Sequence, residues 1–307
     1  MSLLSQPHFH SEAAAIARLE RIVWPDGPFC PRCGGFDRIT PVKGGRAGLR
    51  RCGPCKREFT VTIGTIFERS HVKLHKWFQA AHLMASSKKG ISAHQLHRTL
   101  KVTYKTAWFM EHRLREAMRE GNLGNLSALG GSGKIVEIDE TMQGRVAGAP
   151  KKIPHGHHLN WRNIVLTLVE RQGHARSFHV DSATMATLLP IIRGNISRES
   201  EVMTDELTAY KNLGADFASH QSVNHSAKEY VRGKVTTNTV EGYFALFKRG
   251  MKGVYQHCSE RHLHRYLAEF DFRYNARAAL GVSDEGRADK LIHGIVGKRL
   301  TYRDSSL

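Results

Sequence analysis

The sequence contains no long hydrophobic run. No segment of its 307 residues approaches the ~20 consecutive apolar residues that are needed to span a membrane. The first residues also lack the apolar stretch of a secretion signal, because Glu12, Arg18 and Glu20 interrupt it. We therefore expect no membrane partner and a cytoplasmic location.

Acidic residues are scarce. The chain contains 28 Asp and Glu against 46 Lys and Arg, which gives a formal net charge of +18. Residues 1–125 hold 21 of the basic and 9 of the acidic residues, a local excess of +12. Lys and Arg release counterions when they neutralise phosphates, so this segment favours a polyanionic partner. A merely solvated basic surface is the alternative, because net charge describes association rather than fold.

Cysteine is also sparse, and four of the five cysteines form two C-x2-C pairs. The pairs are separated by 18 residues, a spacing typical of a structural zinc site. Four thiolates in this pattern complete a tetrahedron with no open position. Disulfides are disfavoured in a cytoplasmic chain, so we predict a zinc ribbon over residues 18–68. The ligands are Cys30, Cys33, Cys52 and Cys55, and the neighbouring Arg50, Arg51, Lys56 and Arg57 are candidate DNA contacts.

The segment 69–122 has a helical pattern. Apolar residues recur at three- and four-residue spacings from Leu74 to Leu83, and Ser92 can cap a short helix that ends at Leu100. A brief turn then leads to an amphipathic helix over Tyr104–Met118, so the order is typical of a DNA-binding helix-turn-helix. A helical hairpin that only links two domains is the alternative. The expected solvent-facing DNA contacts are Lys105, Arg113 and Arg115.

A glycine-rich linker over 123–133 precedes an expected α/β domain over 134–278. Three strands form a meander, and a crossover helix leads to a fourth strand that should pair in parallel with the first. A further apolar helix, residues 262–278, should cover the sheet, and we expect 279–307 to be a loosely attached tail. The expected elements are strands 134–141, 163–170, 175–180 and 201–206 and a helix over 184–194.

Two acidic positions lie where strands of this domain end. Asp139 and Asp205 should meet at the edge where open α/β sheets collect their ligands. Downstream, a helix within 236–252 places Glu241 and Lys248 on one face, two turns apart. Each of these residues also has a non-catalytic interpretation. Asp residues are common in the turns where strands end. Asn238 and Glu241 also match a capping box, which needs no catalysis.

The order IDE, TDE and NTVEGYFALFKRG resembles the DDE transposases of bacterial insertion sequences. More narrowly it resembles the ISXO2-like transposases of the IS1595 group, which combine an N-terminal zinc ribbon with an Asn-x-x-Glu…Lys signature. The resemblance extends from about Trp24 to Arg277. It implies a ribonuclease-H-like mixed sheet with flanking helices, preceded by the zinc ribbon and the helix-turn-helix segment.

The family's functional residues can be carried over by motif. Its two catalytic aspartates fall on Asp139 and Asp205, and its signature lysine falls on Lys248. The Asn-x-x-Glu motif falls on Asn238 and Glu241. The group uses Asn as well as Glu as the third metal ligand; we favour Glu241, with Asn238 in support.

The resemblance implies an enzyme that binds the terminal inverted repeats of an insertion sequence, cleaves the strand and transfers it into target double-stranded DNA. Two magnesium or manganese ions bridged by carboxylates suit this chemistry. A homo-oligomer that joins two DNA ends and a location at the nucleoid are further expectations. A non-catalytic regulator and a structure-specific nuclease are the alternatives. Residues expected along the DNA path are Lys228, Arg249 and Lys252.

Overall fold

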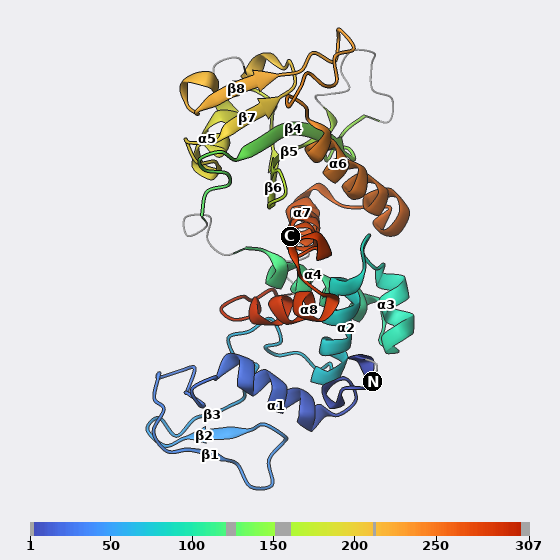
Figure 1. Cartoon of the computed structure of the whole chain (residues 1–307). Coiled ribbons are helices and arrows are strands. Elements are labelled where there is room, and N and C mark those ends of the chain that lie inside the picture. The colour runs from blue at the N-terminus through green and yellow to red at the C-terminus, as the bar shows by residue number, and fades with distance from the viewer. Residues whose placement is uncertain (1–2, 121–126, 151–160, 211–212, 302–307) are drawn as a thin grey trace. The chain divides into compact units, whose positions relative to one another are not determined.

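The computed structural model describes two compact units, which we treat separately (Figure 1). The first comprises residues 1–119 and 282–307, and the second comprises 120–281. Within them the described residues are 3–120, 127–150, 161–210 and 213–301. Residues 123–126 of the expected linker and 302–307 of the expected tail lie outside this set.

The first unit begins with a helix followed by a small antiparallel sheet. Helix α1 (Glu12–Val23) is capped by the Ser11 hydroxyl, which accepts from the amide of Ala14. Strand β2 is central in the sheet, and the guanidinium of Arg50 on β2 binds both carboxylate oxygens of Glu20 at 2.9 and 2.8 Å. The strands are β1 (Ile39–Pro41), β2 (Arg50–Cys52) and β3 (Glu58–Phe59).

Three helices follow, where the sequence predicted them. They are α2 (Leu74–Ser86), α3 (Ala93–Leu100) and α4 (Tyr104–Met118). Ser92 caps α3 by accepting from the amide of Gln95 at 3.2 Å, which confirms the predicted cap. The large side chains that hold the helices together, among them Trp77, Phe78 and Leu96, are almost fully buried.

The C-terminal residues are packed into this same unit. Helix α8 (Asp284–His293) contacts α2, and Leu291, Ile292 and Ile295 are buried. Arg287 of α8 donates to the carbonyl of Ala85. The expectation of a loosely attached tail is therefore wrong for residues 284–301. The apolar stripe of α8 is short and interrupted by charged residues, so the sequence pattern did not indicate that this helix packs against α2.

The second unit is built on a five-stranded mixed sheet in the order β6-β5-β4-β7-β8. Strands β4, β5 and β6 form an antiparallel meander, and β7 pairs in parallel with β4 and with β8. This arrangement confirms the predicted meander and parallel fourth strand. The bounds are β4 (Ile135–Gln143), β5 (Asn163–Glu170), β6 (Ala175–Val180), β7 (Glu201–Thr204) and β8 (Ser219–Ser222).

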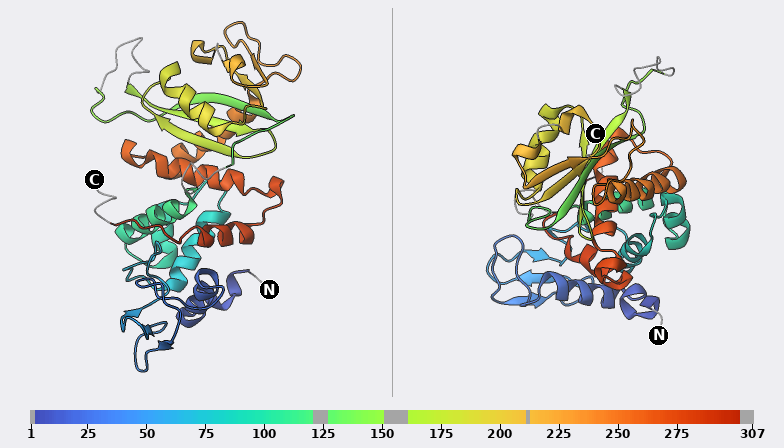
Figure 2. Two further views of the ribbon diagram at one scale, coloured as in Figure 1. Left: turned by 90° about the vertical axis from the view of Figure 1, so that its left-hand side faces the viewer. Right: turned by 45° about the horizontal axis from the view of Figure 1, so that its top comes forward.

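Helices cover both faces of this sheet (Figure 2). Helix α5 (Met185–Asn195) packs on the face that carries Val136 and Ile138. Helices α6 (Asn238–Gly250) and α7 (Leu263–Asn275) pack on the opposite face. The chain also contains 3-10 turns at Leu3–Ser5, Pro7–Phe9, Thr208–Tyr210, Leu213–Ala215, Glu260–His262 and Ala278–Leu280 and a π-helical turn at Met251–Tyr255.

The end of the predicted linker belongs to this domain. Leu129 is buried against the α5 side of the sheet and forms a bridge with Ile196. The amide of Gly130 donates to Glu170, and a side chain at Gly130 would meet the Ser200 hydroxyl at 2.1 Å. The glycine is thus needed for close packing rather than for a flexible link. None of the described helices is long and apolar enough to cross a membrane.

The packing of α8 predicts a large effect of a core truncation there. Leu291→Ala should lower the free energy of unfolding of the first unit by about 2–5 kcal/mol, because a fully buried leucine leaves a cavity. Val296→Ala, at a side chain that is 51% exposed, is the matched control and should change it by less than about 0.5 kcal/mol. Equal, small effects in urea denaturation would instead support a loosely attached tail.

Candidate active site and zinc centre

The sheet places two aspartates side by side. Glu137 of β4 pairs with Met203 of β7, and Asp139 and Asp205 each lie two residues further along these parallel strands. Their carboxylates therefore meet at the end of β7, with ligand oxygens less than 4.8 Å apart. This confirms the predicted parallel pairing and the predicted juxtaposition of the two aspartates.

A third carboxylate of this cluster, Glu140, was missed by the sequence analysis. Its oxygens lie within 4.8 Å of those of both aspartates. Successive strand residues point to opposite faces, so Asp139 lies on the α6 and α7 face and Glu140 on the α5 face. The phenol of the buried Tyr210 donates to Glu140 at 2.5 Å. The acidic IDE motif was the only sequence signal for Glu140.

The pKa of each of the three carboxylates is raised. Burial, followed by the charges of Glu140 and Asp205, raises the pKa of Asp139 to about 8. Burial also raises the pKa of Glu140 and of Asp205. Like charges crowded in a partly buried site favour protonation, or the binding of a cation that neutralises them. Oxygen atoms at this separation are suitable ligands for a divalent ion such as Mg²⁺.

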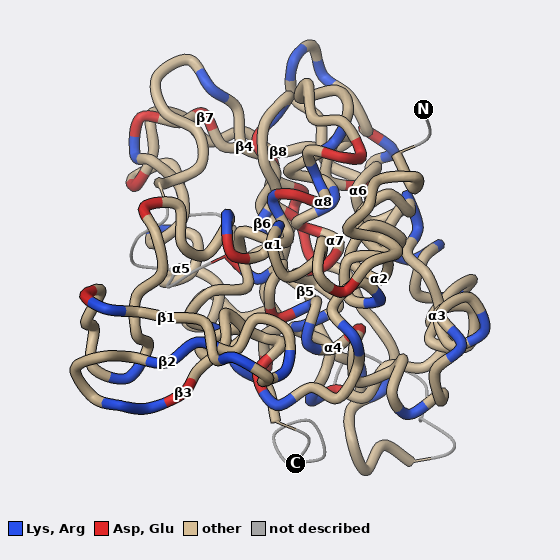
Figure 3. Tube along the Cα trace, turned by 90° about the horizontal axis from the view of Figure 1, so that it is seen from below, with Lys and Arg blue, Asp and Glu red and all other residues tan. Residues whose placement is uncertain are grey.

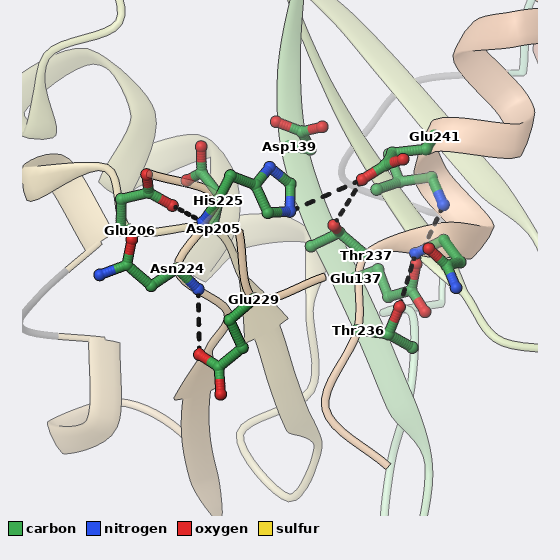
Figure 4. A network of polar contacts seen from close by, with 12 residues as sticks. Glu137, Asp139, Asp205, Glu206, Asn224, His225, Glu229, Thr236, Thr237 and Glu241 are labelled. Carbon is green, nitrogen blue, oxygen red and sulfur yellow. Dashed lines mark hydrogen bonds and ion pairs between the residues drawn. The ribbon is translucent and has the colours of Figure 1, made fainter. Parts of the chain in front are cut away.

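Glu241 lies in the first turn of α6, and Figure 4 shows it on the opposite side of His225 from Asp205. It accepts from the Thr237 hydroxyl at 2.9 Å, and its Oε1 is 3.8 Å from Nε2 of His225. Its charge contributes to the raised pKa of Asp139. Glu241 is not one of the three carboxylates within 4.8 Å, and its side chain is 45% exposed.

The start of α6 is held by Glu137, a second residue that the sequence analysis missed. Its carboxylate is completely buried and accepts from the amides of Thr239 and Val240 at 2.7 and 3.0 Å. Arg171 donates to the same carboxylate at 2.6 Å. The capping-box alternative is wrong: Thr237 is the cap residue, and Glu241 accepts from its hydroxyl. A residue 100 positions upstream thus replaces the local cap.

Glu206 anchors the loop that carries His225. Its carboxylate accepts from the amides of His225 and Ser226 at 2.8 and 2.9 Å and from the Ser226 hydroxyl at 2.7 Å. These hydrogen bonds, the Ser226 hydroxyl first, lower the pKa of Glu206 to about 2. Glu206 is therefore ionised at neutral pH, and His225 is held between Asp205 and Glu241 (Figure 4).

The other residues expected at this site are exposed. Asn238 is the first residue of α6, and Lys248 lies on the same helix with its Nζ 5.9 Å from the ring centroid of Phe244. Lys248 is seven residues beyond Glu241, a distance of roughly 10 Å along the helix axis. The candidate DNA contacts in this unit, all exposed, are Lys228, Arg249 and Lys252.

The four predicted zinc ligands converge in the first unit. The Sγ atoms of Cys30 and Cys55 are 3.7 Å apart and those of Cys33 and Cys52 are 3.6 Å apart, and all four lie within 4.8 Å of one another. Zn–S bonds of about 2.3 Å in a tetrahedron require sulfur atoms about 3.8 Å apart. The donor set therefore fits a closed, structural zinc site.

Three of the predicted DNA contacts have structural roles instead. Arg50 is bound to Glu20 and lies over the Trp24 ring. Arg113 is buried and donates to the carbonyls of Ile66, Glu68 and Leu300, and Arg115 is buried beside Glu111. The prediction that the α4 arginines face solvent is thus wrong, because both guanidinium groups find partners in the core. Figure 3 shows Lys and Arg along β2 and around α3, and the candidates that are exposed are Arg51, Lys56, Arg57 and Lys105.

Comparisons with known proteins agree with this arrangement. Residues 129–275 match the ISXO2-like transposase domain, and residues 10–58 match the transposase zinc-ribbon domain. The chain belongs to the ISXO2-like transposases of the IS1595 family. A protein of the transposable element ISH50 from Halobacterium salinarum is 29% identical over 284 residues, 86% of this chain and 91% of the relative.

Two further similarities complete the comparison. A transposase-like protein of Haemophilus influenzae is 30% identical over 96 residues, which cover 31% of this transposase and 76% of the relative. The cryoEM structure of the simian T-cell lymphotropic virus intasome with PP2A regulatory subunit B56 gamma aligns with 15% identity and a TM-score of 0.29, over 57% of this chain and 67% of that chain. The latter likeness is too low to carry an argument.

The thiolate geometry predicts the metal content of this transposase. Cys52→Ser should lose the bound zinc and destabilise the first unit, because structural zinc contributes ~10–16 kcal/mol in small modules. Cys258→Ser is the matched control: this thiol lies outside the four-cysteine group and should leave one zinc per chain. Mass spectrometry of the purified proteins measures both, and equal zinc in the two variants would refute the site.

The raised pKa of Asp139 predicts a pH-dependent stability change. A carboxyl group with a folded pKa of about 8 and an ordinary unfolded value loses its contribution to stability as the pH rises from about 4 to 8. Asparagine cannot ionise, so Asp139→Asn removes this loss. In the presence of a metal chelator at about pH 8, the free energy of unfolding of the variant should exceed that of the wild type by ~1 kcal/mol or more. At about pH 5 the difference should be smaller. Urea denaturation at both pH values measures the difference.

The control for this variant is Asp181→Asn, at an exposed aspartate of the same unit. It should change the stability little at either pH. With excess Mg²⁺ the order should reverse, because a bound ion stabilises only the protein that retains its ligand. An Asp139→Asn effect that is the same at both pH values would show that ionisation of the buried carboxyl group is not its cause.

Proposed function

We propose that this transposase binds the terminal inverted repeats of its insertion sequence and catalyses divalent-metal-dependent strand cleavage and strand transfer. The observation that carries the proposal is the meeting of the Asp139, Glu140 and Asp205 carboxylates beside the end of β7, in a chain of this family. In the first step a water oxygen bonds to phosphorus and the bond to the 3′ oxygen breaks. In the second step the oxygen of the released 3′ hydroxyl loses its proton and bonds to a phosphorus of target DNA, while the bond from that phosphorus to the target strand's own 3′ oxygen breaks and that oxygen takes up a proton.

We infer that Asp139, Asp205 and Glu241 hold the metal ions. Two divalent ions at such a site stabilise the attacking and the leaving oxygen. Asp139 lies on the face that α6 covers, and Glu241 is in the first turn of α6. Glu140 lies on the opposite face, where the Tyr210 phenol already holds it, so we assign it a supporting role. Burial, followed by the charges of Glu140 and Asp205, raises the pKa of Asp139 to about 8, and a bound cation would favour the ionised form.

The exposed basic residues would bind the DNA. Lys248, two helical turns from Glu241, would contact a phosphate, and the exposed Lys228, Arg249 and Lys252 would follow the same strand. Phosphate contacts fix the position of DNA but do not read its sequence. Recognition of the repeats would then fall to the zinc ribbon and to the pair α3 and α4, and two bound ends would require a homo-oligomer.

Cleavage and joining of a labelled element-end duplex in Mg²⁺ test the proposal. Asp205→Asn and Glu241→Gln should each reduce cleavage by at least ~100-fold, since they remove charge that acts on the transition state. Glu140→Gln should reduce it by less than about tenfold. Glu199→Gln, at an exposed glutamate of the same unit, is the control. A larger loss in Glu140→Gln than in Glu241→Gln would move the third ligand to Glu140.

The same assay separates the alternatives. Specific binding of the duplex without cleavage by the wild type would favour a non-catalytic regulator. Cleavage of branched DNA without end joining, and without dependence on the terminal repeat, would favour a structure-specific nuclease. Joining that depends on the repeat and is lost in Asp205→Asn supports the transposase.

A further inference from the structure

The segment between β8 and α6, Val223–Val235, connects two parts of the proposed catalytic site. We call it the 223–235 loop; it follows Asp205 and precedes Glu241 in the chain (Figure 1, orange). Val223 and Val235 are buried and pack with Met203 of β7 in a small cluster of their own. Both ends of the loop are therefore fixed against the strand that leads to Asp205.

Hydrogen bonds hold the middle of this loop in one conformation. Glu206 accepts from the amides of His225 and Ser226, and the Asn224 side chain accepts from the amide of Ala227. Arg232 donates to the carbonyl of Ser222 and pairs with the amide and carbonyl of Val235. A loop with this many internal bonds can present its side chains in a defined place.

The loop presents two apolar side chains to solvent. Tyr230 is 56% exposed and Val231 is 55% exposed. The Tyr230 ring is tilted by 36° against the His225 ring, with centroids 5.2 Å apart. His225 in turn lies 3.8 Å from Glu241. An exposed aromatic ring is thus separated from a proposed metal ligand by a single side chain.

The charge of the loop complements a nucleic acid. It contains the cations Lys228, Arg232 and Lys234 and one acidic residue, Glu229. Cations follow the phosphates of a strand, and an aromatic side chain stacks on the face of a base. Inside a duplex both faces of a base are already stacked on its neighbours, whereas an unpaired base offers a free face to Tyr230.

We propose that Tyr230 is a DNA-binding residue that stacks on an unpaired base of the strand next to the phosphate to be cut, with His225 supporting the ring from behind. The inference rests on the proposed function, because it deepens the account of the same site. It defines the substrate as a DNA end that is locally unpaired at the active site. A second copy of this chain is the other possible occupant of the exposed Tyr230 and Val231, and the test below separates the two.

The experiment measures binding of the full-length protein to two DNA duplexes, one fully paired and one with a short unpaired tail that contains 2-aminopurine. Ca²⁺ replaces Mg²⁺, because it also takes carboxylate oxygens, and a gel verifies that the DNA remains intact. The wild type should quench the 2-aminopurine fluorescence and prefer the tailed duplex. Tyr230→Ala should lose the quenching and bind the tailed duplex about 5- to 100-fold more weakly.

Two control variants isolate the ring. Tyr230→Phe retains the ring and should behave as the wild type, and Val231→Ala removes a neighbouring exposed apolar group and should change neither readout. Unchanged quenching and affinity in Tyr230→Ala would overturn the inference. Loss of a dimer in Tyr230→Ala by light scattering, with DNA binding unchanged, would overturn it in favour of a contact between copies.

These readouts do not depend on catalysis. If the wild type fails to cleave an element end but shows Tyr230-dependent quenching, the inference stands and the proposed reaction fails. If Asp205→Asn abolishes cleavage while Tyr230→Ala retains full quenching and affinity, the reaction stands and the inference fails. Thermal melting of each variant controls for folding, and the exposure of Tyr230 predicts no change.

Discussion

The geometry of the candidate site depends on one buried carboxylate. Glu137 lies on β4 two residues before Asp139, and its carboxylate accepts from the amides of Thr239 and Val240 at the start of α6, directly before Glu241. A charged acceptor at a helix N-terminus satisfies amides that have no partner within the helix and interacts favourably with the helix dipole. Arg171 compensates the charge that this arrangement buries. The distance between the strand that carries the first aspartate and the helix that carries Glu241 is therefore set by hydrogen bonds that take no part in the proposed chemistry.

The site combines a rigid frame with carboxylates that repel one another. The parallel pairing of β4 and β7 brings Asp139 and Asp205 together, and burial raises the pKa of both. A fold that forces such groups together loses stability at neutral pH unless a cation binds. In this transposase the frame is supported by apolar packing on both faces of the sheet, which offsets that cost. The four thiolates of the zinc ribbon fit a metal ion differently, since a tetrahedral set of four leaves no open position.

Much of the structure of the first unit could be predicted from local sequence patterns. The two C-x2-C pairs predicted the cysteine cluster, and the bounds of α4 and the Ser92 cap of α3 were also predicted correctly. The burial of the two α4 arginines was not predicted. A guanidinium group can lie in a core when it has acceptors there: the Ile66 and Glu68 carbonyls for Arg113, and the Glu111 carboxylate for Arg115. Such partners are distant in sequence, and periodicity carries no information about them. Helix α8 was missed for the same reason.

The amino-acid sequence by itself determined the strands β5 and β6, the bounds of α4, the family signature and the identity of the two aspartates, because these depend on alternation, spacing and residue type. Only the tertiary structure decided which carboxylates meet. It brought Glu140 into the cluster, left Glu241 beside His225, and gave the capping role to Glu137 rather than to Asn238. Strand register and helix docking place side chains through contacts between residues that can be more than a hundred positions apart, and no local pattern encodes those contacts.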